Sequence, residues 1–339
     1  MSTIDVFHGN VDHSKVTSNK SVHNKKNIFA ILGTKKLILG YVAAIASAIL
    51  ASLTHSISKP LLIDGTTGAD IISPIVLAGI VYIVAGLFFT PLKKNDTIQS
   101  IGKKNIFLMV LIGVAEISAM IVSFSGIKET TAVNASIFIN SEIVFSMMIA
   151  IIIFRERLQT KEVPPFLLIV LGAAIIPLVY DLYSHNMVFS SLVLGDMLII
   201  LGGFFFAAGN MIAKHVSDNV DVKRITQISS LSAGIFGIAL SMGLQAPFDI
   251  TLDQIPAILL IGVLDVGFAA MFFVIALKLI GSIKTILLFS TASVFGMIFA
   301  HLLLNEAITI FNVLSIGVVF LGLYWLRNKI AKSEETLTT

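Results

Sequence analysis

Long apolar runs constrain this chain more than any other feature of its sequence. Each run approaches the ~20 residues that a helix needs to cross ~30 Å of hydrocarbon. The chain is 56% hydrophobic and 13% charged, whereas soluble domains carry about 25% charged residues. It lacks the polar surface of a soluble protein, so we predict an all-α membrane protein. The ten predicted transmembrane helices cover residues 37–57, 71–90, 105–124, 131–154, 163–180, 195–213, 225–244, 255–277, 283–304 and 308–325.

Basic residues distinguish the loops on the two sides of the membrane. With the N-terminus placed inside, all of the 23 Lys and Arg residues except Lys59 and Lys128 fall on the inner side. The outer loops instead carry aspartates, namely Asp64, Asp70, Asp181, Asp249 and Asp253. Because cytoplasmic loops collect Lys and Arg, this distribution predicts that both termini are cytoplasmic.

The two ends of the chain are predicted to lie outside the membrane. Residues 1–34 are polar and have no apolar core behind them, so we expect a disordered cytoplasmic tail. Residues 328–339 form a second, shorter cytoplasmic tail. The first apolar run starts near Leu37, is long enough to span and lacks a clear cleavage site, which argues against a signal peptide.

The cysteine count and the spread of positive charge exclude other roles. Without cysteine, the chain cannot form a disulfide or a thiolate metal site. Its pI is about 9.0, but the basic residues are dispersed over short loops, so no nucleic-acid surface is expected. We expect no metal and no cofactor. The expected partners are the lipid bilayer and a small-molecule substrate, with the chain as a monomer or a homodimer.

The chain contains an internal repeat. Residues 128–158 align without gaps with the segment 150 positions later, and charged residues match near both ends: Lys128 with Lys278, and Glu156 with Glu306. Positions 144, 145, 147 and 150 also carry the same apolar residues as positions 294, 295, 297 and 300. The charged matches weigh more, because apolar identities are common between membrane helices.

The repeat predicts how the two halves are oriented. Five helices fall in residues 35–182 and five in residues 193–327, and because five is odd, the second half must enter the membrane from the opposite face. Such inverted repeats occur in secondary transporters, where substrate sits near the midplane and the halves rock around it. We therefore predict two inverted five-helix repeats and transport by alternating access.

Several segments resemble a known family. AVNASIFINSEIVFSMMIAIIIFRERL (132–158) is similar to the fourth-helix signature of the EamA domain in the drug/metabolite transporter superfamily, with Glu142 and Phe145 at its central Glu and Phe. ASVFGMIFAHLLLNEAI (292–308) resembles the same pattern, and GDML (195–198) resembles the opening of the second repeat. The resemblance covers about residues 37–326. It implies ten helices, secondary transport of a small organic solute, commonly export, and residence in the inner membrane.

The chain departs from this family pattern where the pattern has proline. Ile143 and Ser293 occupy the proline positions, Ala292 replaces the second central Glu, and Arg155 stands where Gly is common. Because proline kinks helices, its absence predicts that the helices over 131–154 and 283–304 are straighter than usual.

Three carboxylates fall near the middle of predicted helices: Glu116, Glu142 and Asp265. An acid at mid-bilayer costs ~2.5–3.5 kcal/mol on insertion scales, so such residues face the bundle interior and mark pathways or proton relays. We interpret the three acids as the wall of a water-accessible chamber that can load and release protons and suits a cationic or zwitterionic solute. The alternative for each is a structural hydrogen bond to a neighbouring helix.

Four polar residues repeat one spacing. His55 and Lys59 lie one turn apart on one helix face, and Asn210 and Lys214 share that spacing with an offset of 155. We predict that the first pair forms a gate, or contacts an anionic group, near the outer mouth. For Asn210 and Lys214 we likewise predict a gate, or contact with an anionic group, at the inner side. The alternative is that the lysines extend to the membrane interface.

The remaining polar residues inside predicted helices receive two interpretations. Asn134 and Asn140 are candidates for contact with polar groups of the solute. Glu156 and Glu306 are expected to end helices at the interface and to serve topology or packing.

The sequence favours a transporter over an enzyme or a channel. It contains no His-Glu-x-x-His, Gly-x-Ser-x-Gly or Walker A motif, so we expect no catalytic residues. A channel needs a continuous polar or carbonyl-lined pore, whereas an inverted repeat favours alternating access. The leading prediction is a secondary transporter of an amino acid or related metabolite, with proton coupling as an option. The alternative solutes are nucleotide-like metabolites or cationic drugs, exported or exchanged.

Overall fold

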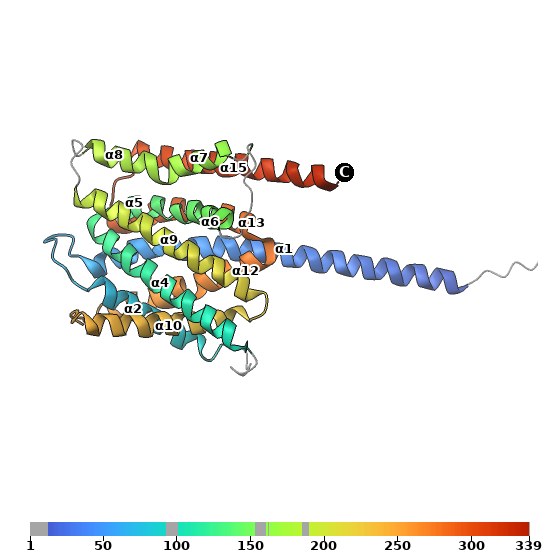
Figure 1. Cartoon of the computed structure of the whole chain (residues 1–339), viewed down its shortest axis with the longest axis horizontal. Helices are drawn as coiled ribbons and strands as arrows, with labels where there is room; N and C mark the ends of the chain where they lie inside the picture. The colour runs from blue at the N-terminus through green and yellow to red at the C-terminus, as the bar shows by residue number, and fades with distance from the viewer. Residues whose placement is uncertain (1–12, 93–100, 153–160, 162, 185–189, 339) are drawn as a thin grey trace, which may run out of the picture.

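The computed structural model describes residues 13–92, 101–152, 161, 163–184 and 190–338. Within these ranges the secondary structure is helical, and an isolated bridge between Ile63 and Asp70 is the sole β pairing. Figure 1 shows the helices side by side in one bundle, most of them along a common direction. Nine helices of the described ranges are long and apolar enough to cross a membrane. The protein is therefore an all-helical, multi-pass membrane protein.

The helices follow the predicted spans closely. The first half contains α1 (His13–Leu62), α2 (Pro74–Phe89), α4 (Lys103–Glu129), α5 (Ala132–Phe138), α6 (Ser141–Ile152), α7 (Val163–Val170), the π-helix η1 (Leu171–Ile175) and α8 (Ile176–Ser184). The second half contains α9 (Ser191–Ser217), α10 (Val222–Gly243), α11 (Ile255–Leu260), the π-helix η2 (Ile261–Ala269), α12 (Ala270–Ile280), α13 (Ser282–Phe289), α14 (Ala292–Leu304) and α15 (Ile310–Thr338).

Helix α2, which corresponds to the predicted span 71–90, is shorter than a full crossing. Its 16 residues rise roughly 24 Å, less than the ~30 Å of hydrocarbon. Pro74 occupies its first helical position, where the missing N–H is harmless. The helix packs against α10 and η2, so protein neighbours cover much of its surface.

Both ends of the chain continue as helices beyond the predicted membrane boundaries. The sequence predicts a disordered tail up to residue 34, whereas α1 begins at His13. Helix α15 likewise continues past residue 327 to Thr338. Figure 1 shows both extensions leaving the bundle on the same side. Extending an existing helix adds hydrogen bonds without forming a new nucleus, which explains how polar residues continue these helices.

Two predicted helices are interrupted even though both lack proline. The span 131–154 divides into α5 and α6, and the span 283–304 divides into α13 and α14. Backbone N–H groups at each break bond three residues back: Asn140 to Ile137 O, and Thr291 to Leu288 O. In the second break the hydroxyls of three residues also donate to carbonyls three residues back, and such side-chain bonds compete with regular helix. These are Ser290, Thr291 and Ser293.

The helix pairs join segments that are far apart in the sequence. Helix α4 packs along α9, and α1 packs along η2 and α12. Helix α2 lies along α10, α5 along α14, and both α7 and η1 along α15. In Figure 1, α7, α8 and α15 form one edge of the bundle and α2 and α10 the opposite edge, with α1, α4, α9 and α12 between them.

Polar contacts among helix termini define one end of the bundle, which we call the Lys59 end. Lys59, in the last turn of α1, bonds to Thr130, which follows α4. Thr130 in turn bonds to Asp196, near the start of α9. Helix α1 therefore runs towards the Lys59 end and α9 runs away from it.

Candidate functional site

A chamber with an empty volume of about 760 Å³, which includes its open mouth, lies inside the bundle. Its wall comes from α1, α2, α4, α6, α9, η2, α12 and α13, and so from both halves of the chain. Five of the predicted site residues line it: His55, Glu116, Glu142, Asn210 and Asp265. The chamber thus collects all three of the predicted mid-membrane acids.

Glu142 lies in the first turn of α6, directly after the break from α5. Its Oε1 accepts a 2.8 Å hydrogen bond from Nδ2 of Asn210 on α9. Helix α9 approaches this closely because it carries Gly203. A Cβ at that position would collide with the Ser141 hydroxyl and stand 3.0 Å from the Glu142 nitrogen. An amide of the second half therefore holds a carboxylate of the first half.

Glu116 and Asp265 come from different helices and line the same chamber. Glu116 lies midway along α4, and Asp265 lies in the π-helix η2. Both carboxylates line the chamber together with Tyr82 of α2. π-Helical turns are rare and frequently occur at functional sites, and here such a turn holds Asp265 in the chamber wall.

The chamber acids have no basic partner among the described residues. The ion pairs in this part of the chain join Lys59 to Glu306 and Lys128 to Asp70. No Lys or Arg of the described ranges lines the chamber, and no group of three or more His, Asp or Glu there is arranged to hold a metal ion. Because a buried carboxylate needs a counter-charge, hydrogen bonds or a proton, these acids can hold protons or bind a cationic group.

Aromatic rings form much of the remaining wall. The rings that line it belong to Tyr82, Phe124, Phe206, Phe273 and Phe289. Phe273 and Phe289 meet edge to face with their centroids 4.8 Å apart. The sequence does not single out these rings, because apolar aromatic residues suit lipid-facing and chamber-facing positions equally well. Helix α9 illustrates the point: Phe206 lines the chamber while Phe204 is exposed.

His55 and Lys59, which are predicted to act as a pair, have different surroundings in the structure. The His55 side chain is only 7% exposed and lines the chamber, and its Nδ1 has no hydrogen-bond partner among the described residues. Lys59, one turn further along α1, lies outside the chamber lining and belongs to the contacts at the Lys59 end.

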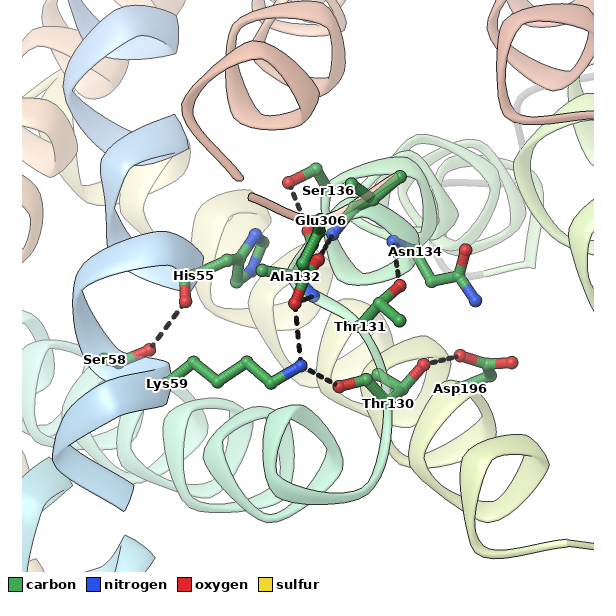
Figure 2. A network of polar contacts seen from close by, with 11 residues as sticks. His55, Ser58, Lys59, Thr130, Thr131, Ala132, Asn134, Ser136, Asp196 and Glu306 are labelled. Atoms are coloured by element: carbon green, nitrogen blue, oxygen red, sulfur yellow. Dashed lines mark hydrogen bonds and ion pairs between the residues drawn. The ribbon is translucent and has the colours of Figure 1, made fainter. Parts of the chain in front are cut away.

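Figure 2 shows these contacts for Lys59, Thr130, Ala132 and Glu306. Together with Val133 these residues form what we call the Lys59 network. Lys59 Nζ lies 2.8 Å from Glu306 Oε1 and donates a 2.8 Å hydrogen bond to the Thr130 carbonyl. The backbone N–H groups of Ala132 and Val133 donate to the two Glu306 oxygens at 3.0 and 2.8 Å. The network ties α1, the start of α5 and the end of α14 together next to the chamber.

Asn134 takes part in a second cluster at the Lys59 end rather than in the chamber lining. It donates a 2.8 Å bond to Asp181 and accepts a 3.1 Å bond from Asn312. Thr130 donates to Asp196, whose carboxylate lies near that of Asp181. The sequence placed Asp181 in an outer loop and Asp196 in a motif, and gave no signal that they meet.

The other predicted residues lie apart from the chamber lining. Asn140 sits at the break between α5 and α6, is 1% exposed, and has no partner for either amide atom within the described residues. Lys214 is exposed near the end of α9. Glu156 lies outside the described residues. Its repeat counterpart Glu306 is expected to end a helix, but α14 ends at Leu304, and Glu306 follows it and enters the Lys59 network.

The family of the chain follows from comparison with known proteins. The model of the EamA-like transporter family matches residues 38–178 and, a second time, residues 193–328. The chain belongs to the EamA-like transporter family. The match confirms the resemblance that residues 132–158 and 292–308 suggest, and it covers each half of this membrane transporter separately.

Other proteins similar to this EamA-like transporter agree with the assignment. An uncharacterized transporter from Methanothermobacter thermautotrophicus is 29% identical over 310 residues, which cover 84% of this chain and 86% of that protein. An uncharacterized transporter from Archaeoglobus fulgidus is 26% identical over 205 residues, or 59% of this chain and 68% of that protein. A crystal structure with 14% identity and a TM-score of 0.60 covers 89% of this chain and 99% of its own, so that protein shares the fold.

Proposed function

We propose that this EamA-like transporter is a secondary transporter that moves a small organic solute across the inner (plasma) membrane by alternating access. The observation that carries the proposal is the acid-lined chamber, whose walls come from both halves of the chain. Acids inside a membrane protein mark solute or proton pathways. The Lys59 network lies one helical turn beyond the chamber residue His55 and acts as the closed gate at that end.

The pattern of helix packing supports two inverted halves of five helices each, with α2 as the tenth membrane helix. Exchanging each helix with its counterpart in the other half converts the α4–α9 pair into the α12–α1 pair. The same exchange leaves the α2–α10 and α7–α15 pairs unchanged, and it also leaves the spans 131–154 and 283–304 paired with each other. Helix α1 and its counterpart α9 run in opposite directions relative to the Lys59 end. This is the twofold arrangement expected of two halves that rock around a shared site.

The charge distribution supports an orientation. We place the Lys59 end outside, because nearly all Lys and Arg residues fall in segments at the other side and such residues collect in the cytoplasm. Both termini are then cytoplasmic.

The chamber chemistry supports a solute that carries a positive charge. Amino acids and related metabolites, which the sequence favours, have an ammonium group, and cationic drugs also fit. Nucleotide-like metabolites would bring negative charge towards three acids. An ammonium group and a proton compete for the same carboxylates, which gives the transporter a route to proton coupling.

Access to the chamber tests the proposal. The chain has no native cysteine, so Ala51→Cys places a unique thiol in the chamber wall. In proteoliposomes, a membrane-impermeant thiol reagent should label this residue from either face, with opposite dependence on solute, and solute counterflow should saturate. Labelling from one face under every condition contradicts alternating access. Simultaneous labelling from both faces together with ohmic conductance indicates a channel instead.

A further inference from the structure

We infer that the solute is an organic amine in its cationic form, with an ammonium group on an apolar frame and no carboxylate. The inference rests on the proposed function, because it assigns the solute of the same chamber. It excludes zwitterionic amino acids, which the positive charge alone would admit. Three features of the chamber carry it: the sign of its charges, the bonding of its hydrogen-bond donors, and its aromatic wall.

The charges of the chamber have one sign. Glu116, Glu142 and Asp265 project from three different helices, and no Lys or Arg of the described residues lines the same space. A solute ammonium can approach any of these walls and find a carboxylate. A solute carboxylate would be desolvated among like charges without a counter-charge, and such a juxtaposition is the usual means of rejecting a wrong ligand.

Two of the hydrogen-bond donors of the wall already serve protein acceptors, whereas the buried Thr54 hydroxyl has no partner among the described residues. Asn210 donates to Glu142 at 2.8 Å, and the Ser47 hydroxyl donates to the Ala269 carbonyl at 2.7 Å. A bound carboxylate is typically held by two or three donors. With Asn210 and Ser47 engaged, the Thr54 hydroxyl is the single uncommitted donor of these three groups. The buried Nδ1 of His55 has no partner among the described residues. In the tautomer that is protonated on Nε2, it accepts an N–H from an ammonium group.

The aromatic wall suits the rest of such a solute. Phe124, Phe206 and Phe289 offer apolar surface between the acids, where a hydrocarbon or aromatic frame is removed from water. A ring face also attracts a cation within about 6 Å of its centre. Carboxylates on several walls with rings between them therefore recognise a cation with a hydrophobic body.

A matched series of four probes tests the solute class. Phenethylamine and phenylalaninol are cations, phenylalanine is a zwitterion, and 3-phenylpropionate is an anion with the same ring. The assay is protection of Ala51→Cys against thiol labelling in the purified full-length protein at pH 7. We expect both cations to protect at concentrations about tenfold or more below phenylalanine, equivalent to ~1.4 kcal/mol or more, and the anion to give no protection. Equal protection by phenylalanine or 3-phenylpropionate, or none by either amine, overturns the inference.

Variants link any protection to the acids. Glu116→Gln, Glu142→Gln and Asp265→Asn, each in the Ala51→Cys chain, should weaken protection by the amines by about tenfold. The matched control is Asp249→Asn, which removes an acid from an exposed loop and should change nothing. Unchanged protection in all three acid variants overturns the assignment. Amines that fail to protect while labelling still alternates between the faces reject the solute class alone. Simultaneous labelling from both faces with ohmic conductance rejects the transport mechanism itself.

Discussion

The chamber and the Lys59 network both place a glutamate inside the bundle, but the two carboxylates have different surroundings. Glu306 accepts from the Lys59 ammonium and from two N–H groups at the start of α5. Such charge-assisted bonds, and the positive end of a helix, match its negative charge. Glu142 accepts one bond from a neutral amide, Asn210. Its charge is left for a proton or a solute to balance.

The two regions also differ in what their acids connect. The Lys59 network joins α1, α5 and α14, and its bonds to Glu306 hold helices of both halves together. The chamber acids project from separate helices into open space. The difference teaches that the identity of the residue does not set the role of a membrane acid, whereas its partners do. Replacement of a network acid should therefore affect stability and access, and replacement of a chamber acid should affect transport.

The largest expected effect is that of Glu142→Gln. Glutamine keeps an oxygen that accepts from Asn210, so we expect expression and the melting temperature to stay unchanged. Transport should fall about tenfold or more, because the charge that binds a proton or an ammonium group is lost. Uptake or efflux in vesicles, measured against external pH, checks this. An unchanged rate with an unchanged pH profile would remove Glu142 from the mechanism. It would also contradict the difference in role between the chamber acids and the Lys59 network.

Glu306→Gln should act in the opposite way. Loss of the charge that holds Lys59 and the start of α5 should reduce stability by about 1–3 kcal/mol. It should also raise labelling of Ala51→Cys from the Lys59 end. Lys59→Met should reproduce both effects, and the double variant should show less than their sum because the two residues interact. Additive effects, or labelling that stays at the level of the unaltered network, would show that the network is not a gate.

Asp196→Asn sharpens the comparison inside the Lys59 end. Asp196 accepts from Thr130 and lies near Asp181, and an asparagine keeps an oxygen acceptor while it removes the negative charge. We expect transport within about twofold of the parent and a stability change of about 1 kcal/mol or less. Counterflow and thermal unfolding measure the two quantities. A transport loss as large as that of Glu142→Gln would make this cluster part of the solute or proton pathway.

The smallest effect is expected for Asp70→Asn. Asp70 lies 2.6 Å from Lys128, but its side chain is 71% exposed. Exposed ion pairs contribute ~0–1 kcal/mol, so we expect a change of about 0.5 kcal/mol or less and unaltered access to the chamber. Thermal unfolding at low and high salt checks the value. A loss of stability comparable to that of Glu306→Gln would show that the two ion pairs contribute equally despite their different burial.

The sequence alone determined the class of this protein, the span of most helices and the three central acids. These follow from a local constraint, because every segment in a bilayer must be apolar and must satisfy its own backbone bonds. A charge in such a segment stands out for the same reason. Glu116, Glu142 and Asp265 could therefore be found without any knowledge of their neighbours.

The tertiary structure decided which polar groups share a space. It placed His55 in the chamber wall and Lys59 outside it, put Asn134 among structural partners, broke two helices that lack proline, and turned Phe206 rather than Phe204 inward. Each outcome depends on contacts between helices far apart in the chain, such as α9 against α6 at Gly203. Hydropathy is a property of one segment, whereas the direction that a side chain faces is a property of the pair of helices that meet there.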